Sequence, residues 1–389
     1  MSSTSYVIRG GEVVTPAGIV RACVLVADGR IRKVGEVSGA EAAGAQVVDA
    51  RGRLVLPGLV ELHVQGAGGS DLFSDDPDAV HNVCRSLAAF GTTAFLATTA
   101  VDTARDDQPH IRQIVEAASA QPPGASILGI HLEGPFISPE KRGMIRPSHI
   151  CKVSRYYYER IGNMCGGWLR MMTIAPELPG ALELVRDMAA SGIVPALGHT
   201  NATYEEALRG LEAGLRHVTH MMNAMRSFHH REPGAVGAVL MHDAFTMQII
   251  TDGVHLHPEV VAWLVRMKGP SRLGIITDGM AATGMPPGRY TYAGVEYSVQ
   301  NGAARYADGT LIGTACTQLE LVRRARQFAG LDLAEAVNMA SLYPARILGV
   351  DGRKGSIAEG RDADLLICDS ELRLESIFVR GAPVCPWDR

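Results

Sequence analysis

Seven acidic or imidazole side chains stand at, or just after, the ends of short apolar runs along the chain. They are His63, Glu133, His199, His220, Asp252, His255 and Asp278. Carboxylates and imidazoles bind divalent metals and carry protons in catalysis. Because unrelated residues would be scattered over many positions in the runs, their common placement at run ends predicts that they meet in one site.

One carboxylate and two imidazoles from three different runs form a candidate metal site. Glu133, His199 and His220 match the His₂Glu donor set, which leaves a coordination position open for water. The pKa of water on such an ion falls from about 15.7 to about 7. The donor set accepts zinc, iron, manganese or cobalt, and we expect a divalent ion with zinc as the leading candidate.

Asp278 is the candidate general acid/base. It follows the apolar run Ile275–Thr277 and precedes Gly279, so the strand delivers a single carboxylate to its own end. Hydrolysis of an amide by an activated water also requires a proton for the leaving nitrogen, and a carboxylic acid can deliver it. The structural alternative is that Asp278 caps the segment that follows.

The elements that must position these groups repeat one plan, a short apolar run followed by a polar turn and an amphipathic helical stretch. The helical stretches include 78–90, 181–190, 203–213 and 258–267, and two more, 318–328 and 333–340, follow the last run. We expect eight strands, at 59–64, 93–99, 127–132, 171–175, 194–197, 217–221, 247–251 and 273–277. Eight strands alternating with helices predict an α/β fold, a (β/α)₈ TIM barrel whose loops after the strands carry the chemistry.

The two chain ends have a different pattern, with β-branched residues and Gly-containing turns. We expect residues 1–56 and 355–389 to form one small β-sandwich domain and residues 57–354 to form the barrel domain. The turn signals Asn301-Gly302 and Asp308-Gly309 predict a β-hairpin insertion near 286–312.

Composition excludes several classes of protein. The chain has 389 residues, a formal net charge of −4 and no run of Lys or Arg, so it offers no basic surface to nucleic acid. No apolar run reaches about 18 residues, and the first residues lack the basic and apolar segments of a leader, which favours the cytoplasm over a membrane. The seven scattered cysteines form no metal or redox motif.

Six segments in order carry a resemblance that covers nearly the whole chain. They are 131–143 (HLEGPFISPEKRG), 198–204 (GHTNATY), 219–225 (THMMNAM), 230–234 (HREPG), 252–255 (DGVH) and 277–278 (TD). Together they resemble N-acetylglucosamine-6-phosphate deacetylases of the amidohydrolase superfamily. The resemblance implies metal-dependent hydrolysis of the N-acetyl group of N-acetylglucosamine 6-phosphate, or of a close analogue, to the amino sugar phosphate and acetate. It also implies the same metal ligands, with Asp278 as the general acid/base.

The resemblance further implies a set of substrate contacts. Asn223 and Ala224 would present amide or main-chain groups, Arg231 and His255 would hold the phosphate, and Leu311, Ile312 and Gly313 would contribute to the sugar pocket. Arginine suits phosphate because its planar fork pairs with two oxygens. In the family the matching arginine comes from the partner subunit, which implies a homodimer with shared active sites.

Two positions depart from the family pattern. Members with two metals have His-x-His on the first strand, whereas this chain has His63-Val64-Gln65. We therefore expect one metal ion, with His63 as a substrate contact or a partial ligand of a second site. Ile145 stands where the family usually has a sugar-contacting histidine, so we expect relaxed or shifted sugar specificity unless Arg146 or His149 replaces that contact.

Three alternatives to this function remain open at the sequence level. A deacetylase of a different N-acyl amino sugar, such as an N-acetylgalactosamine phosphate, would use the same groups. A cyclic-amide hydrolase would share the barrel, but its usual His-x-His and bridging lysine are not evident. A binding protein that senses sugar phosphates should have lost Asp278 or a metal ligand, and the chain has kept both.

Overall fold

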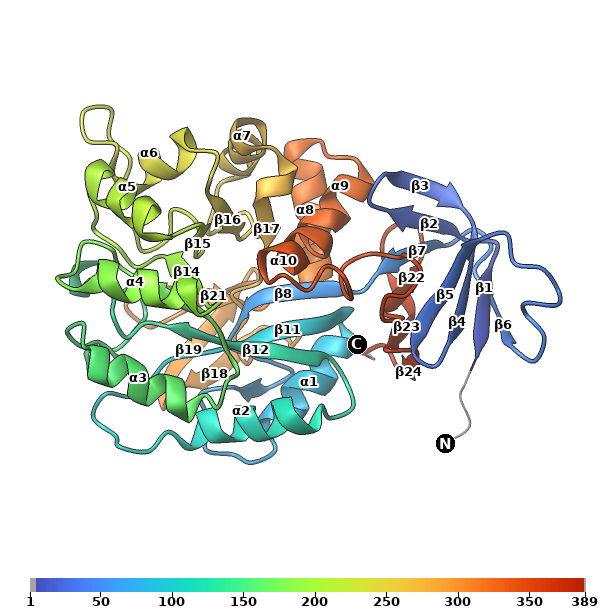
Figure 1. Ribbon diagram of the computed structural model, residues 1–389, viewed down its shortest axis with the longest axis horizontal. Coiled ribbons are helices and arrows are strands. Elements are labelled where there is room, and N and C mark those ends of the chain that lie inside the picture. The colour runs from blue at the N-terminus through green and yellow to red at the C-terminus, as the bar shows by residue number, and fades with distance from the viewer. Residues whose placement is uncertain (1–4, 388–389) are drawn as a thin grey trace.

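A parallel barrel forms the larger part of the computed structural model, which describes residues 5–387 (Figure 1). Neighbouring barrel strands pair in sequence order, so the predicted (β/α)₈ architecture is confirmed. The strands are β8 (Leu59–Val64), β11 (Thr92–Thr99), β12 (Ser126–Glu133), β13 (Leu169–Ile174), β14 (Val194–Leu197), β15 (His217–Val218), β16 (Thr246–Ile249) and β17 (Leu273–Ile275).

The barrel closes through the segment that follows β17. The main-chain N–H of Asp278 donates to the carbonyl of His63 at 3.0 Å, and the N–H of Gln65 donates to the carbonyl of Gly279 at 2.8 Å. Val64 and Gly279 form a parallel bridge between these bonds. The closing seam therefore sets the end of the first strand beside Asp278.

Helices surround the barrel in the expected alternation. Thr203 and Glu206 form a capping box at the start of the helix after β14, where each side chain bonds the other residue's main-chain N–H. The α-helices are α1 (Ala79–Ala89), α2 (Pro109–Ala120), α3 (Arg155–Met164), α4 (Ala181–Ala190), α5 (Tyr204–Ala213), α6 (Gly234–Met241), α7 (Pro258–Lys268), α8 (Gln318–Ala329), α9 (Leu333–Met339) and α10 (Leu342–Ile347). Short 3₁₀ turns are η1 (Pro139–Lys141), η2 (Pro147–His149) and η3 (Pro270–Arg272). No helix among the described residues is long and apolar enough to cross a membrane.

Both chain ends contribute to a β-sandwich beside the barrel (Figure 1). One sheet has the order β5-β4-β1-β6 and the other the order β24-β23-β22-β7-β2-β3, and apolar residues such as Val26 and Ile367 fill the space between them. The strands are β1 (Tyr6–Arg9), β2 (Glu12–Thr15), β3 (Gly18–Arg21), β4 (Cys23–Ala27), β5 (Arg30–Gly35), β6 (Gln46–Asp49), β7 (Leu54–Pro57), β22 (Leu365–Cys368), β23 (Leu374–Val379) and β24 (Ala382–Val384). The predicted domain limits stay proposals, and their first and last residues lie outside the described part.

The insertion after β17 is larger than the predicted hairpin. It is a four-stranded antiparallel sheet of β18 (Gly288–Tyr292), β19 (Val295–Gln300), β20 (Ala303–Arg305) and β21 (Leu311–Thr314). The Asn301-Gly302 turn lies where predicted, with φ of 54° and 79°, and a second tight turn at Ala293-Gly294 lacks the usual Asn or Asp signal. A short ribbon of β9 (Gly66–Ala67) and β10 (Ser70–Asp71) follows the first barrel strand.

Candidate active site and metal centre

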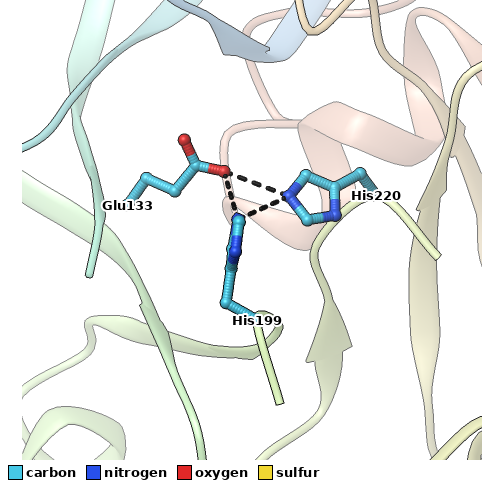
Figure 2. A group of neighbouring side chains, drawn as sticks. All are labelled: Glu133, His199 and His220. Carbon is cyan, nitrogen blue, oxygen red and sulfur yellow. Dashed lines mark hydrogen bonds and ion pairs between the residues drawn. The ribbon is translucent and has the colours of Figure 1, made fainter. Parts of the chain in front are cut away.

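Three predicted metal ligands converge at the mouth of the barrel (Figure 2). Nε2 of His199 and Nε2 of His220 each lie 3.0 Å from the same oxygen of Glu133, Oε1, and 3.1 Å from one another. All three side chains are buried. Two ring nitrogens and a carboxylate oxygen aimed at one point form a donor set that fits a divalent cation.

The hydrogen bonds around the imidazoles favour this use. Nδ1 of His199 donates to the carbonyl of Lys141 at 2.9 Å, so a neutral ring keeps its lone pair on Nε2. Burial lowers the pKa of His220, which keeps that ring neutral as a ligand must be. Burial alone would raise the pKa of Glu133, but His63 and the two ligand histidines outweigh it and hold that pKa well below its usual range.

The backbone at the three strand ends adopts an uncommon conformation. His199, His220 and Asp278 have φ of 47°, 25° and 49°, in or near the left-handed region that residues other than glycine seldom adopt. This also explains why β15 ends at Val218, before the predicted Met221, because His220 turns the chain out of the extended form. Such conformations cluster at functional sites, where the surrounding structure holds them in place.

Asp278 lies beside the metal-ligand cluster. Its side chain faces the same cavity, and its residue is 8% exposed. Its main chain is held on two sides, by the carbonyl of His63 and by the N–H of Thr314 in β21, at 3.0 Å each. The oxygen Oδ1 lies 3.3 Å from Nε2 of His63 and 3.4 Å from Nε2 of Gln65. No side chain among the described residues bonds the other oxygen, Oδ2, which is therefore available to a bound molecule.

A cavity of about 150 Å³ joins these groups, and Glu133, His199, His220 and Asp278 all line it. Of the predicted substrate contacts, five share its wall: Asn223, Ala224, His255, Leu311 and Ile312. Three further lining residues are Gln65, Gly143 and Met144. A larger cavity of about 580 Å³ near Trp387 has no carboxylate, imidazole or thiol among the residues that line it, whereas the smaller one holds the whole His₂Glu cluster.

Comparison with known proteins agrees with the site's geometry. The amidohydrolase family profile matches residues 54–385. N-acetylglucosamine-6-phosphate deacetylase of Bacillus subtilis is 33% identical over 97% of this chain and 96% of its own length. The chain belongs to the N-acetylglucosamine-6-phosphate deacetylase family of amidohydrolases.

Two further similarities bear on the substrate and the fold. N-acetylgalactosamine-6-phosphate deacetylase of Escherichia coli O157:H7 is 32% identical to this amidohydrolase over 97% of the chain and 98% of its own length. A Mycobacterium smegmatis N-acetyl-D-glucosamine-6-phosphate deacetylase, solved as an aspartate-to-alanine mutant in complex with N-acetyl-D-glucosamine-6-phosphate, superimposes with a TM-score of 0.90 at 31% identity. That match covers 98% of this chain and 100% of the other.

His63, a predicted substrate contact, lies behind the residues that line the cavity of this amidohydrolase. Its side chain is completely buried and does not line the cavity. Nδ1 lies 3.3 Å from Oε1 of Gln248, and Nε2 lies 3.5 Å from Oε1 of Glu133. Burial opposes its charging, but Glu133 and Asp278 together raise the pKa of His63 to about 9. His63 therefore contacts both carboxylates without lining the cavity.

The remaining predicted contacts divide into two groups. His255 lines the cavity, and its Nδ1 donates to Oδ2 of Asp252 at 2.7 Å, which fixes the ring. Arg231 is exposed on a loop, where its Nη1 contacts Nε2 of His230 at 2.8 Å, and it does not line the cavity of its own chain. Ile145 is buried and also lies off the cavity wall, as does Gly313.

The contacts of Gln65 were not predicted from the sequence. The sequence showed only that Gln65 stands where a second histidine would be expected. Residues i and i+2 of a strand project to the same face, and Gln65 comes directly after Val64, the last residue of β8, so one more step of that alternation would point Gln65 to the same side as His63. That periodicity was the available signal. The carbonyl of Lys141, which orients His199, has no side-chain signal at all.

Proposed function

We propose that this amidohydrolase hydrolyses the N-acetyl group of N-acetylglucosamine 6-phosphate to the amino sugar phosphate and acetate. One observation carries the proposal: a His₂Glu donor set and the Asp278 carboxylate line the same cavity. Relatives with that activity match 97% of the chain. The fold alone would not distinguish an amide hydrolase from many other barrel enzymes.

We propose that Glu133, His199 and His220 hold one divalent ion, with zinc as the first candidate. The fit rests on the two Nε2 atoms, which face one carboxylate oxygen from buried positions. Three protein donors with an open position are typical of a catalytic centre of this kind. Such an ion supplies Lewis acidity toward the acetyl carbonyl and the water nucleophile.

In the proposed reaction the chain's own residues move one proton. Asp278 takes a proton from the attacking water through Oδ2 and delivers it to the sugar nitrogen as the C–N bond breaks. The water oxygen stays on the acetyl carbon, and the products are acetic acid and the free amine; at neutral pH the proton of the acid passes to the amine, which gives acetate and the ammonium form of the amino sugar phosphate. His63 and Gln65 hold the opposite oxygen, Oδ1, so that Oδ2 keeps its direction.

Recognition of the phosphate supports a homodimer with shared active sites. The described residues that line the cavity include neither Arg nor Lys, so a single chain offers the phosphate no permanently cationic side chain there. Arg231 and the half-exposed Phe228 lie on one loop after β15, and neither lines that cavity. We propose that this loop reaches the cavity of a second copy, where Arg231 contacts the phosphate.

The state of the cysteines supports a cytoplasmic location. All seven are free, which fits the reducing cytoplasm.

N-acetylgalactosamine 6-phosphate is the second candidate substrate. The relative named for its deacetylation is 32% identical to this chain, about as similar as the relatives named for the glucosamine form.

Acetate release across a panel of sugars tests the function. The panel comprises N-acetylglucosamine and N-acetylgalactosamine, each with and without a 6-phosphate, and a cyclic amide such as a hydantoin. The proposal expects the highest kcat/KM with N-acetylglucosamine 6-phosphate. Preference for the 4-epimer would establish the second candidate, and turnover of the cyclic amide alone would show that the proposal is wrong.

A further inference from the structure

The main chain that carries the metal ligand His199 is in an uncommon conformation and needs support from its surroundings. Its φ of 47° lies in the left-handed region, where residues other than glycine stay only when neighbouring structure holds them. Main-chain bonds supply part of that support. The N–H of Ser138 donates to the carbonyl of His199 at 2.9 Å, and the N–H of Thr200 donates to the carbonyl of Ala224 at 3.2 Å.

A carboxylate from another loop holds the two residues that follow His199. Glu177 lies on the loop after β13, and its Oε2 accepts from the hydroxyl of Thr200 at 2.6 Å while its Oε1 accepts from the main-chain N–H of Asn201 at 2.6 Å. Thr200 is completely buried, and its hydroxyl in turn accepts from the N–H of Ala202 at 3.0 Å. One carboxylate thus fixes both a side chain and the main chain directly after the metal ligand.

Glu177 is not half of an ion pair. It is partly buried, and its hydrogen-bond partners among the described residues are Thr200 and Asn201, neither of which is a cation. Removing a carboxylate from water without a cation costs free energy, which short hydrogen bonds to the charged group offset. The two bonds therefore hold Glu177 and the segment after His199 together.

Asn201 joins this segment to two further loops. Its Nδ2 donates to Oε2 of Glu140 at 2.6 Å, and its Oδ1 accepts from Nε of Arg226 at 3.4 Å. Glu140 belongs to η1, and the carbonyl of the next residue, Lys141, accepts from the ring of His199. The segment that Glu177 fixes is therefore also bonded to the turn that orients the His199 imidazole.

We infer that Glu177 is a positioning residue for the metal ligand His199: by holding Thr200 and Asn201, it keeps the imidazole in place before a metal ion binds. The inference rests on the proposed metal role of His199 and not on the identity of the sugar. A ligand that is already ordered loses little conformational freedom on binding, so loss of Glu177 should weaken metal binding. At saturating zinc the coordinate bond itself orders His199, so turnover should then change little.

The zinc affinity of Glu177→Ala tests the inference, with Glu206→Ala as a matched control. Glu206 is also partly buried, and its Oε2 accepts from the main-chain N–H of Thr203 on the same segment, but it does not bond residues 199–201. Competition with a chelator of known affinity should give a zinc Kd about 10- to 100-fold higher for Glu177→Ala and a wild-type Kd for Glu206→Ala. With zinc saturating, kcat of Glu177→Ala should stay within about 3-fold of the wild type.

Two results of this comparison would overturn the inference. One is a zinc Kd for Glu177→Ala within about 3-fold of the wild type, and the other is an equal rise for Glu206→Ala, because loosening of the segment would then be sufficient. Urea unfolding of the metal-free proteins identifies a variant that does not fold. In that case Glu177→Gln decides, because its amide oxygen can still accept from Asn201: a Kd raised by about 3-fold or more supports the inference, and a wild-type Kd overturns it.

A double-mutant cycle with Thr200→Val makes the result specific to the contact. Valine replaces the hydroxyl with a methyl group, so Thr200→Val should raise the zinc Kd by itself. Because both substitutions break the same hydrogen bond, their combined effect should be smaller than the product of the separate effects, and a combined effect equal to that product would overturn the inference. A wild type that binds zinc but releases acetate from no sugar would remove the proposed function and leave this cycle decisive. A wild type that binds no zinc would overturn the proposed metal centre and the inference together.

Discussion

The Nδ1–H of His199 donates to the main-chain carbonyl of Lys141 over 2.9 Å, and this one bond turns Nε2 toward Glu133 and His220. A main-chain acceptor cannot be lost by substitution, so the orientation of His199 depends on the conformation of the loop after β12. Metal binding should therefore depend both on the side chains of Glu133, His199 and His220 and on the conformation of the loop that contains Lys141.

The first prediction concerns the metal. Chelation should abolish activity and a divalent ion should restore it, because both the water and the carbonyl need a Lewis acid. His199→Ala and His220→Ala should each lose metal and turnover together, and elemental analysis of the wild type should find about one ion per chain. Full activity in metal-stripped enzyme would show that hydrolysis does not require the metal.

The second prediction concerns Asp278. Asp278→Asn should keep the metal, because the three ligands are intact, but kcat should fall by a factor on the order of 10² or more when the proton carrier is removed. KM should change less. Steady-state kinetics on protein of measured metal content checks this, and normal turnover by the Asn variant would assign proton transfer to another group.

The third prediction concerns phosphate recognition by Arg231. Arg231→Ala should raise KM for a phosphorylated sugar by about 10-fold or more, because a charge-assisted contact contributes about 1.5–3 kcal/mol. The unphosphorylated sugar should be almost unaffected. Equal losses on both sugars would instead indicate a defect in folding or assembly.

Subunit mixing shows whether that arginine acts across a dimer. Arg231→Ala and Asp278→Asn subunits are each impaired alone, but a hybrid dimer contains one site with an intact Asp278 and an intact partner arginine. Mixing the two variants should therefore restore activity on the phosphorylated sugar. No restoration, with hybrids demonstrated by mass spectrometry, would place Arg231 in the site of its own chain.

The barrel could be predicted from the sequence because its signals are local. Each strand such as Thr92–Thr99 is a short apolar run of its own, and each capping box lies within four residues. The contacts of Gln65 could not be predicted, because Glu133 and Asp278 lie 68 and 213 positions away. The early end of β15 escaped prediction for a similar reason, since the φ of 25° at His220 depends on what surrounds it.

The fourth prediction concerns acid stability and a histidine away from the metal cluster. His110 is buried in α2 and donates from Nε2 to the carbonyl of Ala100 at 3.0 Å. Burial lowers its pKa from 6.5 to about 4, so the folded protein binds this proton less readily than the unfolded chain. Its contribution is therefore fully present above pH 6.5 and is lost as the pH falls from 6.5 through about 4, by about 3 kcal/mol in total.

His110→Gln provides the matched measurement, because an amide N–H can keep the bond to Ala100 and does not titrate. Urea unfolding between pH 7 and 4 should show a smaller decrease in the free energy of unfolding for the variant than for the wild type. Parallel curves would mean that another group, such as Glu133, dominates the acid response. Activity at pH 7 should be unchanged.

The fifth prediction concerns the sugar. The wall of the cavity carries Met144, whereas Ile145 is buried off that wall and its carbonyl accepts from Nη1 of Arg142 at 2.9 Å. Arg146 and His149, the other expected donors, do not line the cavity either. An apolar wall separates substrates that differ in one hydroxyl only weakly, whereas a hydrogen-bonding group separates them strongly. We therefore expect the wild type to accept both N-acetylglucosamine 6-phosphate and its 4-epimer, within about 10-fold in kcat/KM.

Two histidine substitutions distinguish the neighbouring positions. Met144→His places a donor on the wall and should change the ratio of kcat/KM between the two epimers by about 10-fold or more, because a substrate hydroxyl then gains or lacks a partner. Ile145→His should leave that ratio near the wild-type value, since its side chain does not reach the cavity. The reverse result, a shifted ratio for Ile145→His alone, would mean that the loop after Gly143 turns Ile145 inward when the sugar binds. An unchanged ratio in both variants would assign sugar recognition to other residues that line the cavity, such as Leu311 and Ile312.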